Sequence, residues 1–204
     1  MASVVIPYRG PGGKERFRPA PAEVRAALAL AMLGDVLGAC AAVGRILLVT
    51  KDEESVPAYA EEAGAEIVLD PGGGQGAAVA AALAKVEEWP ALVVNADLPC
   101  VQSRDVLALL GSLPGGGIAL VPARDGTTNA LALSGPLLYA PVYGPGSAAR
   151  FGERAARLDA EIAVTEIPNL VEDVDTLADL ERLEGLLGRR TQAALESLRA
   201  GLAR

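Results

Sequence analysis

The chain lacks histidine altogether and has only two cysteines, Cys40 and Cys100, among its 204 residues. Without histidine, zinc sites that use imidazole ligands and catalysis by a Ser-His or Cys-His pair are excluded. Two cysteines provide neither a disulfide framework nor the spacing of a metal-ligand motif. The sequence therefore excludes zinc enzymes and histidine-dependent hydrolases as functional classes.

Aromatic residues are also scarce, at 3% of the chain, although apolar residues make up 51%. Alanine and leucine carry this hydrophobicity, so we expect a large, helix-rich core of small side chains. The longest apolar region, residues 26–43, is interrupted by Asp35 and by glycines, which predicts a core helix and not a membrane span. The first residues lack the charged-then-apolar order of a signal peptide. We therefore expect a soluble cytoplasmic protein without a membrane partner.

Positive charge is limited, and the net charge of −8 argues against a nucleic-acid partner, since binding to phosphate backbones requires a basic face. Basic residues nevertheless gather near the N-terminus, at Arg9, Lys14, Arg16, Arg18 and Arg25. A basic loop within an acidic protein is a candidate site for a small anion. A solvated, charged loop is the alternative, and charge alone favours neither.

Short apolar runs alternate with helical patterns along the chain. We expect strands at residues 3–7, 45–50, 66–69, 91–95, 117–122 and 129–134, and an edge strand at residues 161–165. We expect helices at residues 22–43 (ended by Gly44), 53–63 (ended by Gly64), 77–88, 104–110 (with Ser103 as N-cap), 147–158, 177–187 (opened by a capping box of Thr176 and Asp179) and 189–204. This order predicts a single domain, residues 1–204, with three α/β/α layers around a mostly parallel central sheet.

Three aspartates occupy positions that suggest a metal site. Asp97 follows the apolar run 91–95, so a buried parallel strand would deliver it to the carboxyl edge of the sheet, where open α/β sheets bind ligands. Asp173 and Asp175 are two residues apart and share one face if their segment is extended. Converging carboxylates would hold a divalent cation, and Mg²⁺ suits an enzyme that acts on phosphates. For Asp97 alone, a turn or cap residue after a strand is the simpler interpretation.

Two glycine-containing segments precede expected helices. Residues 70–76 include three successive glycines, which let backbone approach a ligand closely, and the helix that follows begins with free N–H groups. Residues 143–147 place Ser147 at another helix start, which predicts an anion site. Neither segment matches a Walker loop or a dinucleotide-binding fingerprint. A flexible connection and a simple helix cap are the respective alternatives.

Taken together, these segments resemble the guanylyltransferases of deazaflavin coenzyme F(420) biosynthesis, which charge phosphoenolpyruvate or 2-phospho-L-lactate and belong to the nucleotidyltransferase superfamily. The resemblance covers nearly the whole chain and depends on the order and spacing of the set. Its motifs are Ile6-Pro7 with Lys14-x-Arg16, Asp70-x-Gly72-x-Gly74, Ala96-Asp97-Leu98-Pro99, Gly126-Thr127-Thr128-Asn129, Tyr143-Gly144-Pro145-Gly146-Ser147 and Asp173-Val174-Asp175-Thr176. The chain departs from the family at Gln75-Gly76, where Leu-Asn is common, and at Arg9, where Lys is common.

The resemblance implies a nucleotidyltransferase fold and transfer of GMP from GTP to a small phosphorylated three-carbon acid, with release of pyrophosphate. It implies Mg²⁺ as cofactor, and a homodimer is a family-level expectation. Bacterial members of the family are associated with phosphoenolpyruvate, and the alanine- and arginine-rich composition is typical of a bacterial protein. The resemblance therefore favours phosphoenolpyruvate over 2-phospho-L-lactate as the acceptor. The residues it assigns are Asp97, Asp173 and Asp175 to the metal; Asp97, Lys14 and Arg16 to catalysis; Pro7, Arg9, Lys14, Arg16, Gly72, Gly74 and Gly76 to the nucleotide; and Thr128, Gly144 and Ser147 to the acceptor.

Two other functions remain open from the sequence. A related nucleotidyltransferase could charge another acceptor, such as molybdopterin or a sugar phosphate. A nucleotide-binding module could keep the fold and lack the chemistry, although the presence of all three aspartates with Lys14 and Arg16 argues against this. Chemically, the sequence suits GMP transfer, because an ionised acceptor phosphate needs no protein general base and catalysis can come from positioning and charge neutralisation.

Overall fold

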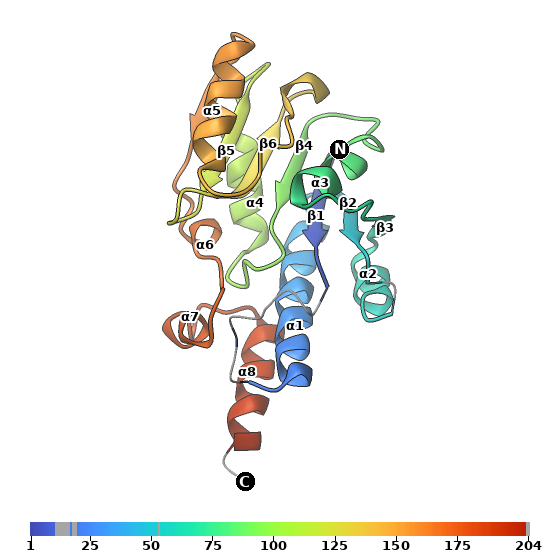
Figure 1. Cartoon of the computed structure of the whole chain (residues 1–204), viewed down its shortest axis with the longest axis vertical. Helices are drawn as coiled ribbons and strands as arrows, with labels where there is room; N and C mark the ends of the chain where they lie inside the picture. The colour runs from blue at the N-terminus through green and yellow to red at the C-terminus, as the bar shows by residue number, and fades with distance from the viewer. Residues whose placement is uncertain (11–16, 18–19, 53, 203–204) are drawn as a thin grey trace.

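The structure is a computed structural model that describes residues 1–10, 17, 20–52 and 54–202. Its described part contains a seven-stranded sheet in the order β3-β2-β1-β4-β6-β5-β7 (Figure 1). The strands are β1 (Ala2–Tyr8), β2 (Gly44–Thr50), β3 (Glu66–Leu69), β4 (Ala91–Val94), β5 (Ile118–Pro122), β6 (Thr128–Leu133) and β7 (Ile162–Val164).

The direction of the strands fixes where a ligand site can form. β1 pairs in parallel with both β2 and β4, whereas β6 runs antiparallel between β4 and β5. The chain order therefore reverses at β1, with β2 on one side and β4 on the other. In open α/β sheets, the crevice at the carboxyl ends of the strands at such a reversal is the usual ligand site.

Helices cover both faces of the sheet because its central strands are apolar on both sides. In β1, Val4, Val5 and Ile6 are fully buried, as expected for a parallel strand inside a sheet. One face packs against α1 (Ala22–Ala41), α2 (Pro57–Ala63), α4 (Ser103–Gly111) and α6 (Pro168–Val171). The other face packs against α3 (Gln75–Leu83), the 3₁₀ turn η3 (Pro136–Leu138) and α5 (Ser147–Arg157). The predicted three-layer α/β/α fold with a mostly parallel sheet is confirmed.

A further apolar cluster lies beyond the edge of the sheet. The helices α7 (Leu177–Arg182) and α8 (Arg189–Leu202) pack there beside α1, which Figure 1 shows running next to α8. Its buried members include Phe17, Met32 and Val174. Val174 lies between two of the predicted metal ligands, so this cluster anchors the segment that carries them.

Several predicted element boundaries were wrong. Gly44 does not end the first helix: α1 ends at Ala41, and Gly44 begins β2. Only glycine fits there, because a Cβ atom would lie 1.9 Å from the carbonyl oxygen of Ala2. Gln102, not Ser103, is the N-cap of α4. By contrast, the capping box of Thr176 and Asp179 at the start of α7 is confirmed.

Other helices begin or end at residues that differ from the prediction. Gly74, with φ +92°, precedes α3, so this helix starts at residue 75 instead of 77 and ends at residue 83 instead of 88. α2 starts at Pro57, which sets its first turn, and α7 is shorter than predicted. The end of α2 at Gly64, which adopts φ +64°, agrees with the prediction.

Among the described helices, α1 is the one long and apolar enough to cross a membrane by length and composition. More than half of its apolar window is buried inside the protein, against β1 and β2 and beside α8. The predicted core helix therefore has the packing of a helix inside a soluble domain. The two cysteines are buried free thiols.

Candidate functional site

A pocket of about 520 Å³ opens at the carboxyl edge of the sheet, where β1, β2, β3 and β4 end. Parallel strands bring their carboxyl ends to one edge, so segments far apart in the sequence meet here. The predicted site residues that line the pocket are Pro7, Arg9, Gly72, Gly74, Asp97 and Asp175. The predicted Lys14 and Arg16 lie outside the described residues.

The backbone ties the segment of Asp173 and Asp175 to the ends of β4 and β6. The Val174 N–H donates to the carbonyl of Asp97 (3.0 Å), and the Asn129 side-chain amide donates to the carbonyl of Val171 (3.1 Å). β6 starts at this edge because it runs antiparallel, which is why Asn129 can reach the segment. These bonds bring the segment of Asp173 and Asp175 to the same edge of the sheet as Asp97.

The surroundings of Asp173 raise the pKa of its carboxyl group. Burial raises its pKa most, and the negative charges of Asp97 and Asp175 raise it further. The Asn129 amide opposes the shift by donating to Asp173 Oδ1 at 3.4 Å. A carboxylate that faces two others in a half-buried site favours a nearby cation.

The arrangement fits Mg²⁺ in part. Among the described residues, no group of three His, Cys, Asp or Glu side chains is gathered tightly enough to hold one ion. Asp97 and Asp175 line the pocket, whereas Asp173 is directed to Asn129. Mg²⁺ commonly takes one or two carboxylates and completes its shell with water and substrate phosphates, which suits the first pair. The metal assignment of the three aspartates stays a prediction.

Glu172, next to Asp173, is held by two arginines. Arg124 from the β5–β6 hairpin and Arg182 from α7 both form ion pairs with it. The hydrogen bond from Arg124 is the main cause that lowers the pKa of Glu172. These contacts tie the segment to the β5–β6 hairpin and to α7.

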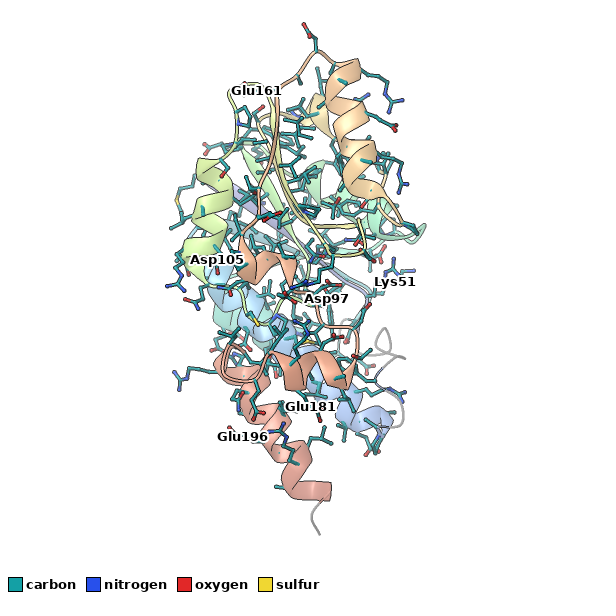
Figure 2. The ribbon with its side chains drawn as sticks, turned by 90° about the vertical axis from the view of Figure 1, so that its left-hand side faces the viewer. Lys51, Asp97, Asp105, Glu161, Glu181 and Glu196 are labelled. Atoms are coloured by element: carbon teal, nitrogen blue, oxygen red, sulfur yellow. The ribbon has the colours of Figure 1, made fainter. Side chains whose placement is uncertain are left out.

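Two cations line the pocket without a partner among the described residues. Neither Arg9 nor Lys51 forms a hydrogen bond or ion pair with another residue that the structure describes, whereas Arg45, Arg124 and Arg182 are paired with glutamates. Figure 2 shows Asp97 near the middle of the molecule and Lys51 to one side of it. Lys51 was not predicted as a site residue, although its position directly after β2, at the carboxyl edge of the sheet, was the available signal.

The glycine loop after β3 forms one wall of the pocket. Gly72, Gly73 and Gly74 all adopt positive φ near +90°, a conformation that favours glycine. The Gly72 N–H donates to Asp70 Oδ1 at 2.8 Å, which fixes the turn. Gly76, predicted to contact the nucleotide, is buried and does not line the pocket. A Cβ there would lie 2.8 Å from the carbonyl oxygen of Pro141, so packing explains this glycine.

The pocket also contains a pair of polar side chains, Gln75 and Asn95, that was not predicted from the sequence. Gln75, at the start of α3, donates through Nε2 to Asn95 Oδ1 at 2.7 Å. Asn95, at the end of β4, donates through Nδ2 to the carbonyl of Thr128 at 3.2 Å. Both side chains line the pocket. No local sequence signal links two amides that are twenty residues apart.

The predicted acceptor residues lie beside the pocket and not in its wall. The hydroxyls of Thr128 and Ser147 are 3.0 Å apart and buried, so they bond to each other. The first N–H groups of α5, expected to be free for an anion, already donate: that of Ser147 to the Gly144 carbonyl and that of Ala148 to the Gly126 carbonyl. This corrects the expectation of free amides there. The acceptor assignment of Thr128, Gly144 and Ser147 stays a prediction.

A family model and individual relatives both match this chain, and both are guanylyltransferases. Residues 2–200 match the family model described as "Guanylyl transferase CofC like". The chain is 38% identical to the phosphoenolpyruvate guanylyltransferase of Sphaerobacter thermophilus, over 82% of this chain and 84% of that protein. It is 34% identical to the 3-phospho-D-glycerate guanylyltransferase of Phenylobacterium zucineum, over 98% of both.

Solved structures share the fold at low sequence identity. A structure from Desulfovibrio desulfuricans, described as a nucleotide-diphospho-sugar transferase, has a TM-score of 0.77 at 17% identity and covers 98% of this chain and 95% of its own. A nucleotidyl transferase from Methanothermobacter has a TM-score of 0.61 at 15% identity, over 91% and 96%. At these identities, the likeness establishes a nucleotidyltransferase-like fold alone.

Proposed function

The chain belongs to the guanylyl transferase family described as CofC like, and on this premise we propose that it transfers GMP from GTP to phosphoenolpyruvate. Pyrophosphate would leave, and the product would serve coenzyme F(420) biosynthesis. The observation that carries the proposal is the pocket at the strand reversal. It combines the carboxylates of Asp97 and Asp175 with the cations of Arg9 and Lys51, which have no partner among the described residues.

The chemistry required of the protein is positioning and charge neutralisation. An acceptor phosphate is ionised at neutral pH, so its oxygen attacks the α-phosphorus of GTP without a side-chain base, which suits a chain without histidine. The P–O bond to the pyrophosphate breaks as the new P–O bond forms. Arg9 and Lys51 would counter the negative charge of the triphosphate, together with Lys14 and Arg16, which stay assigned on resemblance.

The second role, binding of the metal, would belong to the carboxylates. Asp97 and Asp175, with Asp173 behind them, would hold Mg²⁺, which supplies charge neutralisation and orientation of the phosphates when bound. The bonds from Val174 to Asp97 and from Asn129 to the 171–173 segment keep the aspartates in place before substrate arrives. Such preorganisation lowers the cost of reaching the reactive geometry.

Three related acids are candidates for the acceptor. Phosphoenolpyruvate, 2-phospho-L-lactate and 3-phospho-D-glycerate all combine a phosphate with a carboxylate, and the relatives above are named for two of them. Phosphoenolpyruvate is proposed because several relatives at 34–38% identity carry that name. Differences of this size in a small acceptor are worth only about 1–3 kcal/mol, so partial overlap in use is expected.

The direct test is pyrophosphate release on mixing the protein with GTP, Mg²⁺ and single acceptors, with the products identified by mass. The acceptors are the three acids above, a hexose phosphate and molybdopterin. A guanylylated phosphoenolpyruvate as the main product would support the proposal. A dominant product from another acceptor would overturn that choice, and GTP binding without any turnover would favour the non-catalytic alternative.

We also propose that the protein acts in the cytoplasm, without nucleic acid or membrane as partner. The acidic net charge and the burial of α1 in the core support this. The homodimer implied by resemblance is a prediction that sedimentation of the purified protein would test.

A further inference from the structure

The pair Gln75–Asn95 forms a relay whose donors and acceptors have one consistent assignment. The carbonyl of Thr128 can only accept, so the Asn95 amide must present its nitrogen to it, at 3.2 Å. Asn95 Oδ1 is thereby turned toward Gln75, which must present its own nitrogen, at 2.7 Å. The backbone of β6 therefore sets the orientation of both side-chain amides.

The start of α3 holds Gln75 from the other side. The Tyr139 hydroxyl donates to the Gly76 carbonyl at 2.7 Å, and Gly76 packs so closely against Pro141 that no Cβ fits between them. Gly74 caps the helix with φ +92°. Gln75 thus has a fixed backbone and a fixed amide orientation, the two conditions for preorganised recognition.

The relay uses one N–H of Gln75 and leaves its Oε1 and its second N–H for a ligand. The side chain lines the pocket, and no other hydrogen bond joins it to a described residue. The charged side chains of the pocket have other roles: the cations of Arg9 and Lys51 suit phosphates, and the aspartates suit a bound cation. Gln75 and Asn95 are neutral, so they suit the uncharged part of a nucleotide.

We propose that Gln75, oriented by Asn95, is a specificity-determining residue that reads the hydrogen-bonding edge of the nucleotide base; this rests on the proposed function. With the amide orientation fixed, Oε1 accepts from the N1–H and exocyclic N2 amine of guanine. Adenine has an acceptor at N1 and no amine at C2, so it would oppose acceptor to acceptor. Hypoxanthine keeps N1–H and lacks the amine, which makes it an intermediate case.

The test compares GTP, ITP and ATP as donors for the wild type, Gln75→Leu and Asn95→Ala, with Gln192→Leu as a matched control on α8. The wild type should prefer GTP over ITP and ITP over ATP in kcat/KM. Gln75→Leu should lower the GTP-to-ATP ratio by roughly 10- to 100-fold, mainly through KM for GTP, as expected for one lost base contact. Asn95→Ala should lower it less, because Gln75 remains but can flip. Gln192→Leu should leave the ratio unchanged.

Equal losses with all three nucleotides in Gln75→Leu would show that the residue shapes the pocket without reading the base, and would overturn the proposal. So would an unchanged ratio in a variant with a wild-type melting temperature. Equilibrium binding of the non-hydrolysable analogues of GTP and ATP gives the same comparison without an acceptor. If binding discriminates but no acceptor is charged, the proposed function fails while the role of Gln75 stands; if turnover occurs but Gln75→Leu discriminates as the wild type does, the reverse holds.

Discussion

A carboxylate on α1 contributes to the attachment of α8, and its removal gives the most quantitative prediction. Asp35, in the middle of α1, accepts from the backbone N–H groups of Arg190 (3.1 Å) and Thr191 (2.9 Å) and from the Thr191 hydroxyl (2.7 Å). It thus caps the start of α8 from another helix. Gly188 lies so close that a Cβ there would sit 2.2 Å from the Asp35 carboxyl carbon.

The loss of stability in Asp35→Ala can be estimated from these contacts. A hydrogen bond to a charged group contributes about 1.5–3 kcal/mol net, and the negative charge at the helix start adds about 0.3–1 kcal/mol. Thr191 is fully buried, so its hydroxyl would be left unpaired. We therefore expect a loss of about 2–4 kcal/mol in the free energy of unfolding, or roughly 4–16 °C in melting temperature for a chain of this size.

Urea denaturation followed by circular dichroism would measure this loss. Asp35→Asn should recover part of it, because one acceptor oxygen remains. Glu153→Ala is the matched control. Glu153 is an exposed carboxylate on α5 that forms no ion pair with a described residue, and its removal should change the free energy of unfolding by less than about 0.5 kcal/mol. If Asp35→Ala were as stable as this control, the capping argument would be refuted.

Three further predictions concern the pocket. Asp97→Asn should lower Mg²⁺-dependent pyrophosphate release by at least about 100-fold. It should not lower the melting temperature, because it removes a negative charge that acts on Asp173. Near-normal turnover would remove Asp97 from the metal site. Lys51→Met should weaken GTP binding about fivefold at low salt, because one unit charge near a phosphate contributes about 1 kcal/mol in water. The effect should be smaller at high salt, which screens the charge. An equal loss of GTP binding in the remote variant Lys85→Met would contradict a direct role of Lys51. Gly76→Ala should lower the free energy of unfolding by about 1–3 kcal/mol, because the new Cβ atom would clash with Pro141. In Gly152→Ala, on α5, the new Cβ atom meets open space, so this variant should be as stable as the wild type or more stable. Thermal unfolding that ranks the two variants otherwise would contradict the packing argument.

The parts of the fold that follow from local chemistry could be predicted from the sequence. The buried strand β1 and the capping box at Thr176 depend on neighbouring residues alone. Asp97 could be placed at the carboxyl edge of the sheet because it follows an apolar run, as a strand end does, whereas Asp175 was linked to it only through its spacing from Asp173 and the resemblance. Local periodicity and the signals at strand and helix ends were therefore enough to predict the layers of the fold and the position of Asp97.

Features that depend on distant contacts could not be predicted in this way. Gly44 looks like a helix terminator in the sequence, yet its role is set by the carbonyl of Ala2, forty-two residues earlier. The capping carboxylate of α8 lies about 155 residues before it in the chain, on α1. Nothing in either local sequence marks these partners, because the fold alone brings them together.

The direction of β6 explains why the site contains residues that a fully parallel sheet would place elsewhere. In an all-parallel sheet, Thr128 and Asn129 would begin their strand at the edge opposite Asp97. Because β6 runs antiparallel, its first residues meet the end of β4, and the Asn95 N–H donates to the Asn129 carbonyl at 3.0 Å. The same reversal lets Thr128 orient Asn95 and lets Asn129 hold Asp173. One reversed strand thus connects the neutral side of the pocket, with Gln75 and Asn95, to its carboxylate side, so a change in β6 register would disturb both together.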